Sequence, residues 1–148
     1  MKIDVKIKKV REGVQIPEYA TSGSAALDLR HAGDEPITVK AGCRAAIPTG
    51  IAVAPADSSI VSVVCARSGL ATKHGIALAN GIGVIDSDYR GEILVSLLNN
   101  SDTDYVVAPG ERVAQLMFMP VYTANLIVCD ELDETERGSG GFGSTGKN

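Results

Sequence analysis

The sequence predicts an all-β fold: a jelly-roll-like antiparallel β barrel with one short helix and a flexible glycine-rich C-terminal tail. Apolar residues recur mainly with a period of two, which is typical of half-buried strands. Short β-branched runs follow one another along the chain, and turn residues separate them. Because helix signals are few and the strands are short and many, an antiparallel barrel or jelly roll is the expected architecture.

The first expected strand runs from Lys2 to Lys8, where Ile3, Val5 and Ile7 alternate with charged residues and would share one face. The later expected strands are Ile37–Val39, Ile51–Val53, Ile60–Val64, Ile82–Ile85, Ile93–Leu98, Tyr105–Val107, Val113–Met119 and Leu126–Val128. The turns expected between them are Pro48–Gly50, Ser87–Asp88, Asn99–Asp102 and Ala108–Gly110.

One short helix is expected from Ser68 to His74, with Ser68 as its N-cap, and one helical turn from Leu132 to Glu136. Residues 1–136 are expected to form a single β-barrel domain. The glycine-rich residues 137–148 cannot build a core of their own. They are therefore expected to form a mobile tail that belongs to the same functional domain.

Composition narrows the function classes. A net charge of -4 and a pI near 5.1 argue against nucleic-acid binding through phosphate attraction. The N-terminus does not resemble a signal peptide, and no apolar run approaches the roughly 20 residues of a membrane span. Three cysteines without a CxxC pair, Cys43, Cys65 and Cys129, favour reduced thiols and a cytoplasmic location. Two histidines, His31 and His74, argue against a histidine-rich zinc site.

The segment Gly83–Gly91 carries a candidate general base. Val84 and Ile85 run directly into Asp86. A carboxylate that leaves an apolar strand can be partly desolvated, which raises its proton affinity and suits it to general-base work. The alternative is a plain hairpin turn in which Asp86 and Asp88 cap backbone amides.

Arg67, Ser68 and Gly69 form a candidate anion site. A guanidinium offers a planar fork for phosphate oxygens, and the first N–H groups of a helix point toward any anion placed there. The alternative is an ordinary junction between a strand and a helix.

Two strand residues are further candidates. Gln115 is expected on the same face as Val113 and Met117, where its amide needs hydrogen-bond partners. A structural glutamine satisfied by the backbone is the alternative. Asp28, between Leu27 and Leu29, could reach a hard cation, although a purely structural aspartate is equally open at this stage.

The tail resembles a phosphate loop in part. Gly141–Lys147 has the spacing GxxxxGK, but Asn148 replaces the usual Ser or Thr and no helix follows, so a Walker-type ATPase is not expected. Glycine N–H groups, hydroxyls and a lysine can still surround a phosphate. Phe142 in such a segment suggests stacking on a planar base. A solvating tail without a ligand is the alternative.

Five segments in this order resemble the homotrimeric deoxyuridine triphosphate nucleotidohydrolases, the dUTPases. They are Ser24–Leu29, Arg67–Gly69, Gly83–Gly91, Gly110–Gln115 and Arg137–Gly146. The resemblance implies a jelly-roll protomer, a homotrimer with active sites at subunit interfaces, and Mg²⁺-dependent hydrolysis of dUTP to dUMP and pyrophosphate. That activity would limit uracil incorporation into DNA and supply dUMP for dTMP synthesis.

The resemblance also implies residue roles in the hairpin. Asp86 would activate the water that attacks the α-phosphorus. Tyr89 would lie beneath the deoxyribose and leave no room for a 2′-hydroxyl. Asn80 and the neighbouring backbone, including Gly83, would read the uracil edge. Asp28 would reach Mg²⁺ indirectly through water, the ion being held mainly by the triphosphate.

The other segments are implied to hold the rest of the substrate. Ser68, Gly69 and Gln115 would bind the phosphates, with Arg67 close by. The implied substrate-binding residues of the tail are Arg137, Phe142, Gly143, Ser144 and Thr145. Among these, Phe142 would cover the uracil, and Arg137, Ser144 and Thr145 would close on the phosphates.

Two departures and two rival functions remain. Ala66 stands where the family usually has Pro, and Ala26 where it often has Gly. A dCTP deaminase, which shares the fold, would have a catalytic glutamate in the hairpin region instead of Asp86. A catalytically silent nucleotide-binding module on the same scaffold would have no need of Asp86, Tyr89 and the tail.

Overall fold

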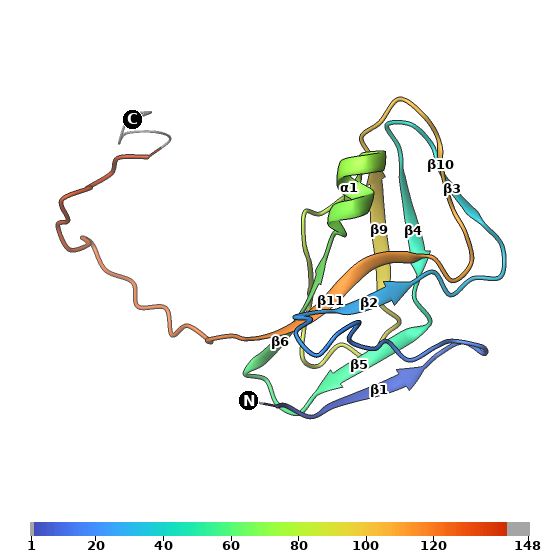
Figure 1. Ribbon diagram of the computed structural model, residues 1–148. Helices are drawn as coiled ribbons and strands as arrows, with labels where there is room; N and C mark the ends of the chain where they lie inside the picture. The colour runs from blue at the N-terminus through green and yellow to red at the C-terminus, as the bar shows by residue number, and fades with distance from the viewer. Residues whose placement is uncertain (1, 142–148) are drawn as a thin grey trace.

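Short strands and one helix build the described residues, 2–141, of the computed structural model. The strands are β1 (Val5–Lys9), β2 (Leu27–Arg30), β3 (Ile37–Val39), β4 (Arg44–Pro48), β5 (Ile51–Pro55), β6 (Ile60–Cys65), β7 (Ile76–Leu78), β8 (Gly83–Ile85), β9 (Leu94–Asn99), β10 (Tyr105–Val107) and β11 (Arg112–Pro120). The helix is α1 (Ser68–His74). Figure 1 shows α1 at one end of β9, above the crossing of β2 and β11.

All strand pairings are antiparallel, and they form four sheets. The sheet orders are β1-β5, β10-β3, β2-β11-β6-β8 and β4-β9-β7. The all-β class with one short helix is therefore confirmed. The strands are divided among separate sheets, and none of these sheets closes on itself within residues 2–141.

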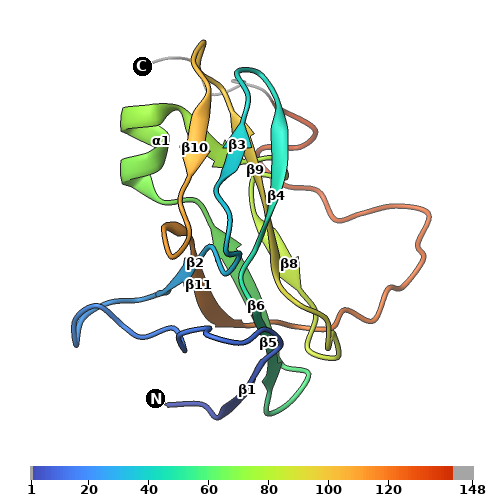
Figure 2. The ribbon, with the colours of Figure 1, turned by 90° about the vertical axis from the view of Figure 1, so that its right-hand side faces the viewer.

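The four-stranded sheet positions the candidate site. Its longest strand, β11, pairs with β2 on one side and with β6 on the other. β8 is the far edge, so β2 and β8 lie on opposite sides of the β11–β6 pair (Figure 2). The β2–β11 register shifts between Arg112 and Ala114, and this irregularity leaves both Val113 and Ala114 buried.

A single apolar cluster lies between the sheets. Its fully buried side chains include Leu29, Ile47, Val95, Val107 and Leu116, one from each of five strands. Burial of such side chains stabilises the fold by roughly 1.5–3 kcal/mol each. This cluster holds the sheets together and fixes the surface on which the polar residues stand.

Most expected strands are confirmed, with ends that differ by a few residues. The runs Ile37–Val39 and Tyr105–Val107 match β3 and β10 in full. β2, β4 and β7 were not among the expected strands; β4, for example, contains two alanines. β1 begins at Val5 rather than Lys2, and Ile3 and Ile7 are exposed, so the half-buried face holds only at Val5.

Three local expectations are wrong. Leu126–Val128 forms no strand: the segment 121–141 leaves β11 as an extended chain away from the sheets (Figure 1), where no described strand lies beside it. Leu132–Glu136 forms no helical turn. The N-cap of α1 is Arg67 instead of Ser68, and it makes no side-chain capping bond.

The described chain contains no helix that is both long and apolar enough to cross a membrane. All three cysteines are free thiols, and two of them, Cys43 and Cys129, are exposed. The division at residue 137 stays a prediction.

Candidate functional site

A row of polar side chains crosses the four-stranded sheet. Gln115 on β11 pairs with Asp28 on one side and with Cys65 on the other. Residues directly opposite in antiparallel strands point to the same face, so the three side chains form one row. Gln115 shares this half-buried face with Met117, as expected, but not with Val113, because the register shift at Arg112–Ala114 turns Val113 into the core.

The Gln115 amide makes no hydrogen bond within residues 2–141. The alternative of a structural glutamine satisfied by the backbone therefore finds no support in the described chain. A half-buried amide with free donors and an acceptor is suited to bind a polar ligand.

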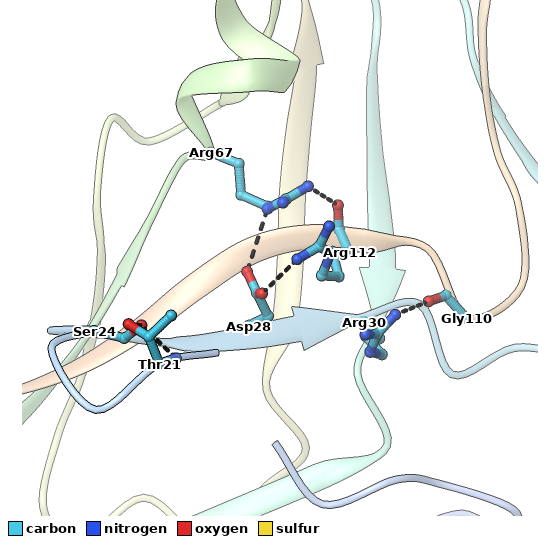
Figure 3. Close-up of polar contacts among 7 residues, drawn as sticks. All are labelled: Thr21, Ser24, Asp28, Arg30, Arg67, Gly110 and Arg112. Atoms are coloured by element: carbon cyan, nitrogen blue, oxygen red, sulfur yellow. Dashed lines mark hydrogen bonds and ion pairs between the residues drawn. The ribbon is translucent and has the colours of Figure 1, made fainter. Parts of the chain in front are cut away.

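Asp28 lies between two guanidinium groups (Figure 3). Arg112 donates to its Oδ2, with 3.0 Å between Nη1 and Oδ2, and Arg67 Nε lies 3.3 Å from its Oδ1. Arg67 also donates from Nη1 to the backbone oxygen of Arg112, at 3.1 Å. The Asp28 side chain is only 14% exposed, and its Oδ1, although close to Arg67, makes no hydrogen bond of good geometry. One acceptor position of this carboxylate is thus open.

Arg67 continues directly into the first turn of α1. β6 ends at Cys65, and Arg67, with an extended backbone of φ −91° and ψ 127°, is the N-cap of the helix. Ser68 and Gly69 follow on the surface, and a Cβ placed on Gly69 would meet no atom within 4 Å. The first N–H groups of a helix lack intrahelical partners, so Ser68 and Gly69 present donors to open space beside Arg67. We call Asp28, Arg67, Ser68, Gly69 and Gln115 the anion cluster.

A turn next to the anion cluster holds the start of β11. Ala108 N donates to Glu111 Oε2 at 2.9 Å, and the Tyr105 hydroxyl donates to Glu111 Oε1. Burial, together with this hydrogen bond, raises the pKa of Tyr105 to about 12. The phenol therefore stays protonated and keeps donating, which fixes the turn that precedes Arg112.

The loop between β7 and β8 brings backbone close to the sheet edge; β7 and β8 lie in different sheets, so the expected hairpin does not form here. Gly81 has φ 73°, and Asn80 is exposed just before it. Gly83 lies opposite Val64, and a Cβ on Gly83 would come within 3.0 Å of the Val64 Cβ. A side chain at position 83 would crowd Val64 on β6, so glycine at this position leaves the backbone of β8 uncovered.

Asp86 leaves the end of β8 and is exposed in the single chain. The expected desolvation is therefore wrong for an isolated protomer, because no other element covers the turn. The capping alternative also finds no support, since neither Asp86 nor Asp88 makes a side-chain hydrogen bond within residues 2–141. Asp86 is a free carboxylate whose backbone oxygen accepts from Tyr89 N at 3.1 Å.

Tyr89 folds back over its own loop. Its hydroxyl donates to the backbone oxygen of Glu92 at 3.0 Å. A Cβ on Gly91 would lie 2.3 Å from the Tyr89 oxygen and 2.5 Å from Cζ, so the ring occupies the space that a side chain at 91 would need. We call Asn80, Gly83, Asp86 and Tyr89 the hairpin cluster.

Within one chain, Asp86 lies away from the anion cluster. β8 runs antiparallel to β6, so Asp86 lies toward the Ile60 end of β6, whereas Arg67 follows its Cys65 end. A strand of 6 residues spans roughly 17 Å, and β2 and β8 are separated by three strand spacings, or roughly 14 Å. No hydrogen bond or ion pair joins the clusters in the described residues. The described residues of one chain therefore do not bring Asp86 and the anion cluster together.

The tail adds a third, separate part. Arg137 donates from Nε to the Gly140 backbone oxygen at 2.8 Å, within a turn that begins at Thr135. It contacts neither cluster. Phe142, Gly143, Ser144 and Thr145 lie outside the described residues.

Three residues of these networks were not predicted. Arg112 lies in a segment that was singled out, yet only Gln115 was assigned a role in it. Arg11 and Glu92 form an ion pair between residues far apart in sequence, with 2.7 Å from Nε to Oε1. No sequence pattern announces such a pair, since it depends on the tertiary fold.

Comparison with known proteins now adds to this geometry. A dUTPase family model matches residues 12–146. The chain is 49% identical over 147 residues to the deoxyuridine 5′-triphosphate nucleotidohydrolase of Paraburkholderia xenovorans (strain LB400), covering 99% of both chains.

Two solved structures share the fold. The dUTPase of Staphylococcus bacteriophage 80alpha with dUPNHPP superposes with a TM-score of 0.87 at 25% identity, covering 97% of this chain and 98% of that one. A mutant dUTPase from phage phi11 of S. aureus, whose structure describes a structural Mg(II) ion, gives a TM-score of 0.79 at 21% identity, covering 88% of this chain and 99% of that one.

Proposed function

The chain belongs to the dUTPase family and hydrolyses dUTP, and from this premise we propose how its residues share the reaction. The products are dUMP and pyrophosphate. The observation that carries the assignment of roles is the free Asp86 carboxylate. It lies just after the end of β8, the strand in which Gly83 leaves no room for a side chain.

Asp86 acts as the general base. Its carboxylate has no protein partner in the described chain, so both oxygens can accept from a water molecule. In an assembled site this carboxylate takes a proton from the water that attacks the α-phosphorus, and pyrophosphate leaves on the opposite side.

The hairpin cluster selects the nucleoside. Asn80 and the backbone around Gly83 offer the amide and peptide groups that the uracil edge requires. The Tyr89 ring lies under the deoxyribose and excludes a 2′-hydroxyl by contact. Rejection of a 5-methyl group requires rigid backbone, because one methyl in an apolar pocket changes binding by only about 1–3 kcal/mol.

The anion cluster holds the triphosphate. Ser68 and Gly69 donate from the open first turn of α1, Gln115 donates from the sheet, and Arg67 supplies positive charge beside them. The Asp28 carboxylate orients Arg67 toward this position through the contact of 3.3 Å.

The side chains of the anion cluster would contact Mg²⁺ only indirectly. Residues 2–141 contain no group of three or more ligating side chains, so the chain itself builds no metal cage. Mg²⁺ typically keeps several waters and takes one or two carboxylates plus substrate phosphates. Asp28 Oδ1 is buried without a hydrogen-bond partner, and it would suit an indirect contact with the ion through water. When bound, the ion neutralises charge on the triphosphate.

We further propose a homotrimer with active sites between subunits. Asp86 serves the α-phosphorus, while the anion cluster serves the same triphosphate, yet in one chain Asp86 lies toward the Ile60 end of β6 and Arg67 follows its Cys65 end. A complete site thus needs the hairpin cluster of one copy and the anion cluster of another. Arg137 and the tail residues Phe142, Gly143, Ser144 and Thr145 close over the substrate. The free thiols support a cytoplasmic location.

Product analysis tests this proposal. Pyrophosphate release is measured with dUTP, UTP, dCTP and dTTP, with and without Mg²⁺. Release from dUTP alone and only with Mg²⁺ is the expected result. Ammonia release from dCTP would instead indicate a deaminase, and binding without turnover would indicate a silent module.

A further inference from the structure

An ion pair outside both clusters involves Glu92, whose backbone oxygen accepts from the hydroxyl of Tyr89, the residue proposed to lie under the sugar. Arg11 holds the Glu92 carboxylate with two hydrogen bonds, from Nε to Oε1 at 2.7 Å and from Nη2 to Oε2 at 3.0 Å. This is the bidentate geometry, the strong and orienting form of an arginine–carboxylate pair. We call it the Arg11–Glu92 clamp.

The clamp is tied to the body of the protein at Gly50. Gly50 N donates to Glu92 Oε1 at 2.7 Å, and Gly50 O accepts from Val10 N at 2.8 Å. Gly50 has φ 69°, and a Cβ there would lie 2.3 Å from Val14 Cγ2 and 2.8 Å from the Ala32 Cβ. Only glycine fits this position, so the clamp has a fixed anchor.

Glu92 connects this anchor to Tyr89. The carbonyl of Glu92 accepts the Tyr89 hydroxyl, and the next residue, Ile93, is fully buried and bonded to β5 through Ile93 N and Ile51 O at 2.9 Å. The side chain of Glu92 and the backbone of Ile93 thus hold the peptide group that receives the Tyr89 hydroxyl. Tyr89 is 44% exposed, and Glu92 O is the only hydrogen-bond partner of its hydroxyl within residues 2–141.

Folding stability alone does not explain this arrangement. The Arg11 and Glu92 side chains are 44% and 19% exposed, and ion pairs at such exposure typically add little to folding stability. A pair that adds little to stability can still orient the groups to which it is bonded.

We propose that Arg11 and Glu92 are positioning residues that hold Tyr89 under the sugar and thereby set discrimination between dUTP and UTP. This inference rests on the proposed role of Tyr89. It adds a control point in the N-terminal segment, far in sequence from every substrate-binding residue. Arg11 touches no substrate atom and acts only through Glu92.

Steady-state kinetics with dUTP and UTP on the full-length protein test the proposal. Arg11→Met should lower the ratio of kcat/KM for dUTP over UTP by at least about five-fold. Arg11→Lys should recover part of the ratio, because an ammonium group still pairs with Glu92 but cannot bind it in the bidentate form. Arg44→Met is the matched control, because the exposed Arg44 side chain makes no hydrogen bond or ion pair in the described chain, and it should leave the ratio unchanged.

A double-variant cycle separates positioning from general damage. Tyr89→Phe keeps the ring and removes the donor to Glu92, so adding Arg11→Met to it should change the ratio no further. An unchanged ratio in Arg11→Met, or equal losses with both substrates, overturns the inference. Tyr89→Ala distinguishes failure of the proposed role of Tyr89 from failure of the inference about Arg11 and Glu92. If Tyr89→Ala leaves the dUTP/UTP ratio unchanged, the proposed role of Tyr89 is wrong. If Tyr89→Ala lowers the ratio but Arg11→Met does not, only the role of the Arg11–Glu92 clamp is wrong.

Discussion

Arg112 donates to Asp28 across the β2–β11 pairing, with 3.0 Å between Nη1 and Oδ2. The same carboxylate faces Arg67 with its other oxygen, so Arg112 fixes the group that orients Arg67 (Figure 3). The anion cluster depends on this contact, although Arg112 itself has no proposed contact with the substrate.

Arg112→Met is expected to raise KM for dUTP roughly ten-fold and to change kcat little, because Asp28 loses one partner and orients Arg67 less well. Arg30→Met is the matched control: Arg30 lies opposite Arg112 in the register but donates to the Gly110 carbonyl. Steady-state kinetics compare the two variants. Equal KM values for both would contradict the role of Arg112.

Gly91→Ala is expected to displace the Tyr89 ring without unfolding the protein. The new Cβ would lie 2.3 Å from the Tyr89 oxygen, and a surface side chain can move aside. The melting temperature should stay close to that of the wild type, while relative turnover of UTP rises about ten-fold. Wild-type selectivity in this variant would show that the ring position does not govern sugar choice.

The Arg11–Glu92 clamp predicts a pH-dependent stability difference. The hydrogen bond from Arg11 lowers the pKa of Glu92 below its ordinary value of 4.5. A lowered folded-state pKa means that the carboxylate stabilises the fold above the ordinary value and loses this effect as pH falls through the folded value. The wild type should thus have a higher melting temperature than Glu92→Gln near neutral pH. The difference in melting temperature should disappear once the pH is below the folded-state pKa of Glu92. Thermal unfolding across this range measures the gap, and a gap that widens on acidification would refute the sign.

Deletion of residues 137–148 tests the tail. Residues 137–141 contribute nothing to the apolar core, so the melting temperature should not change. Pyrophosphate release from dUTP should fall at least about 100-fold, because the closing donors and the cover over the base are lost. Phe142→Ala alone should show a smaller loss, mainly in KM. Full activity of the truncated protein would exclude a closing role.

Secondary-structure elements with strong local sequence patterns were the ones predicted correctly. β3, β10 and α1 were predicted in full, since β-branched runs and a short helical stretch are bounded by clear turn residues. β4 has two alanines and gave no such signal. Leu126–Val128 had strand-like composition, but a strand also needs a partner, and sequence composition cannot supply one.

Candidate site residues were easier to predict than the contacts between them. The anion cluster and the hairpin cluster contain only residues expected from the sequence, and no hydrogen bond or ion pair joins the two clusters within residues 2–141. The partners that orient them, Arg112, Glu92 and Arg11, were not predicted. Their contacts join residues 81 and 84 positions apart, and only the folded chain brings these together.

Asp86→Asn tests the central claim most directly. The amide keeps the size and shape of the carboxylate but cannot accept a proton from water. Binding of dUTP, measured by calorimetry in the presence of Mg²⁺, should stay within about three-fold of the wild type, while the rate of pyrophosphate release falls at least about 1000-fold. Turnover at the wild-type rate by this variant would remove Asp86 from the role of general base.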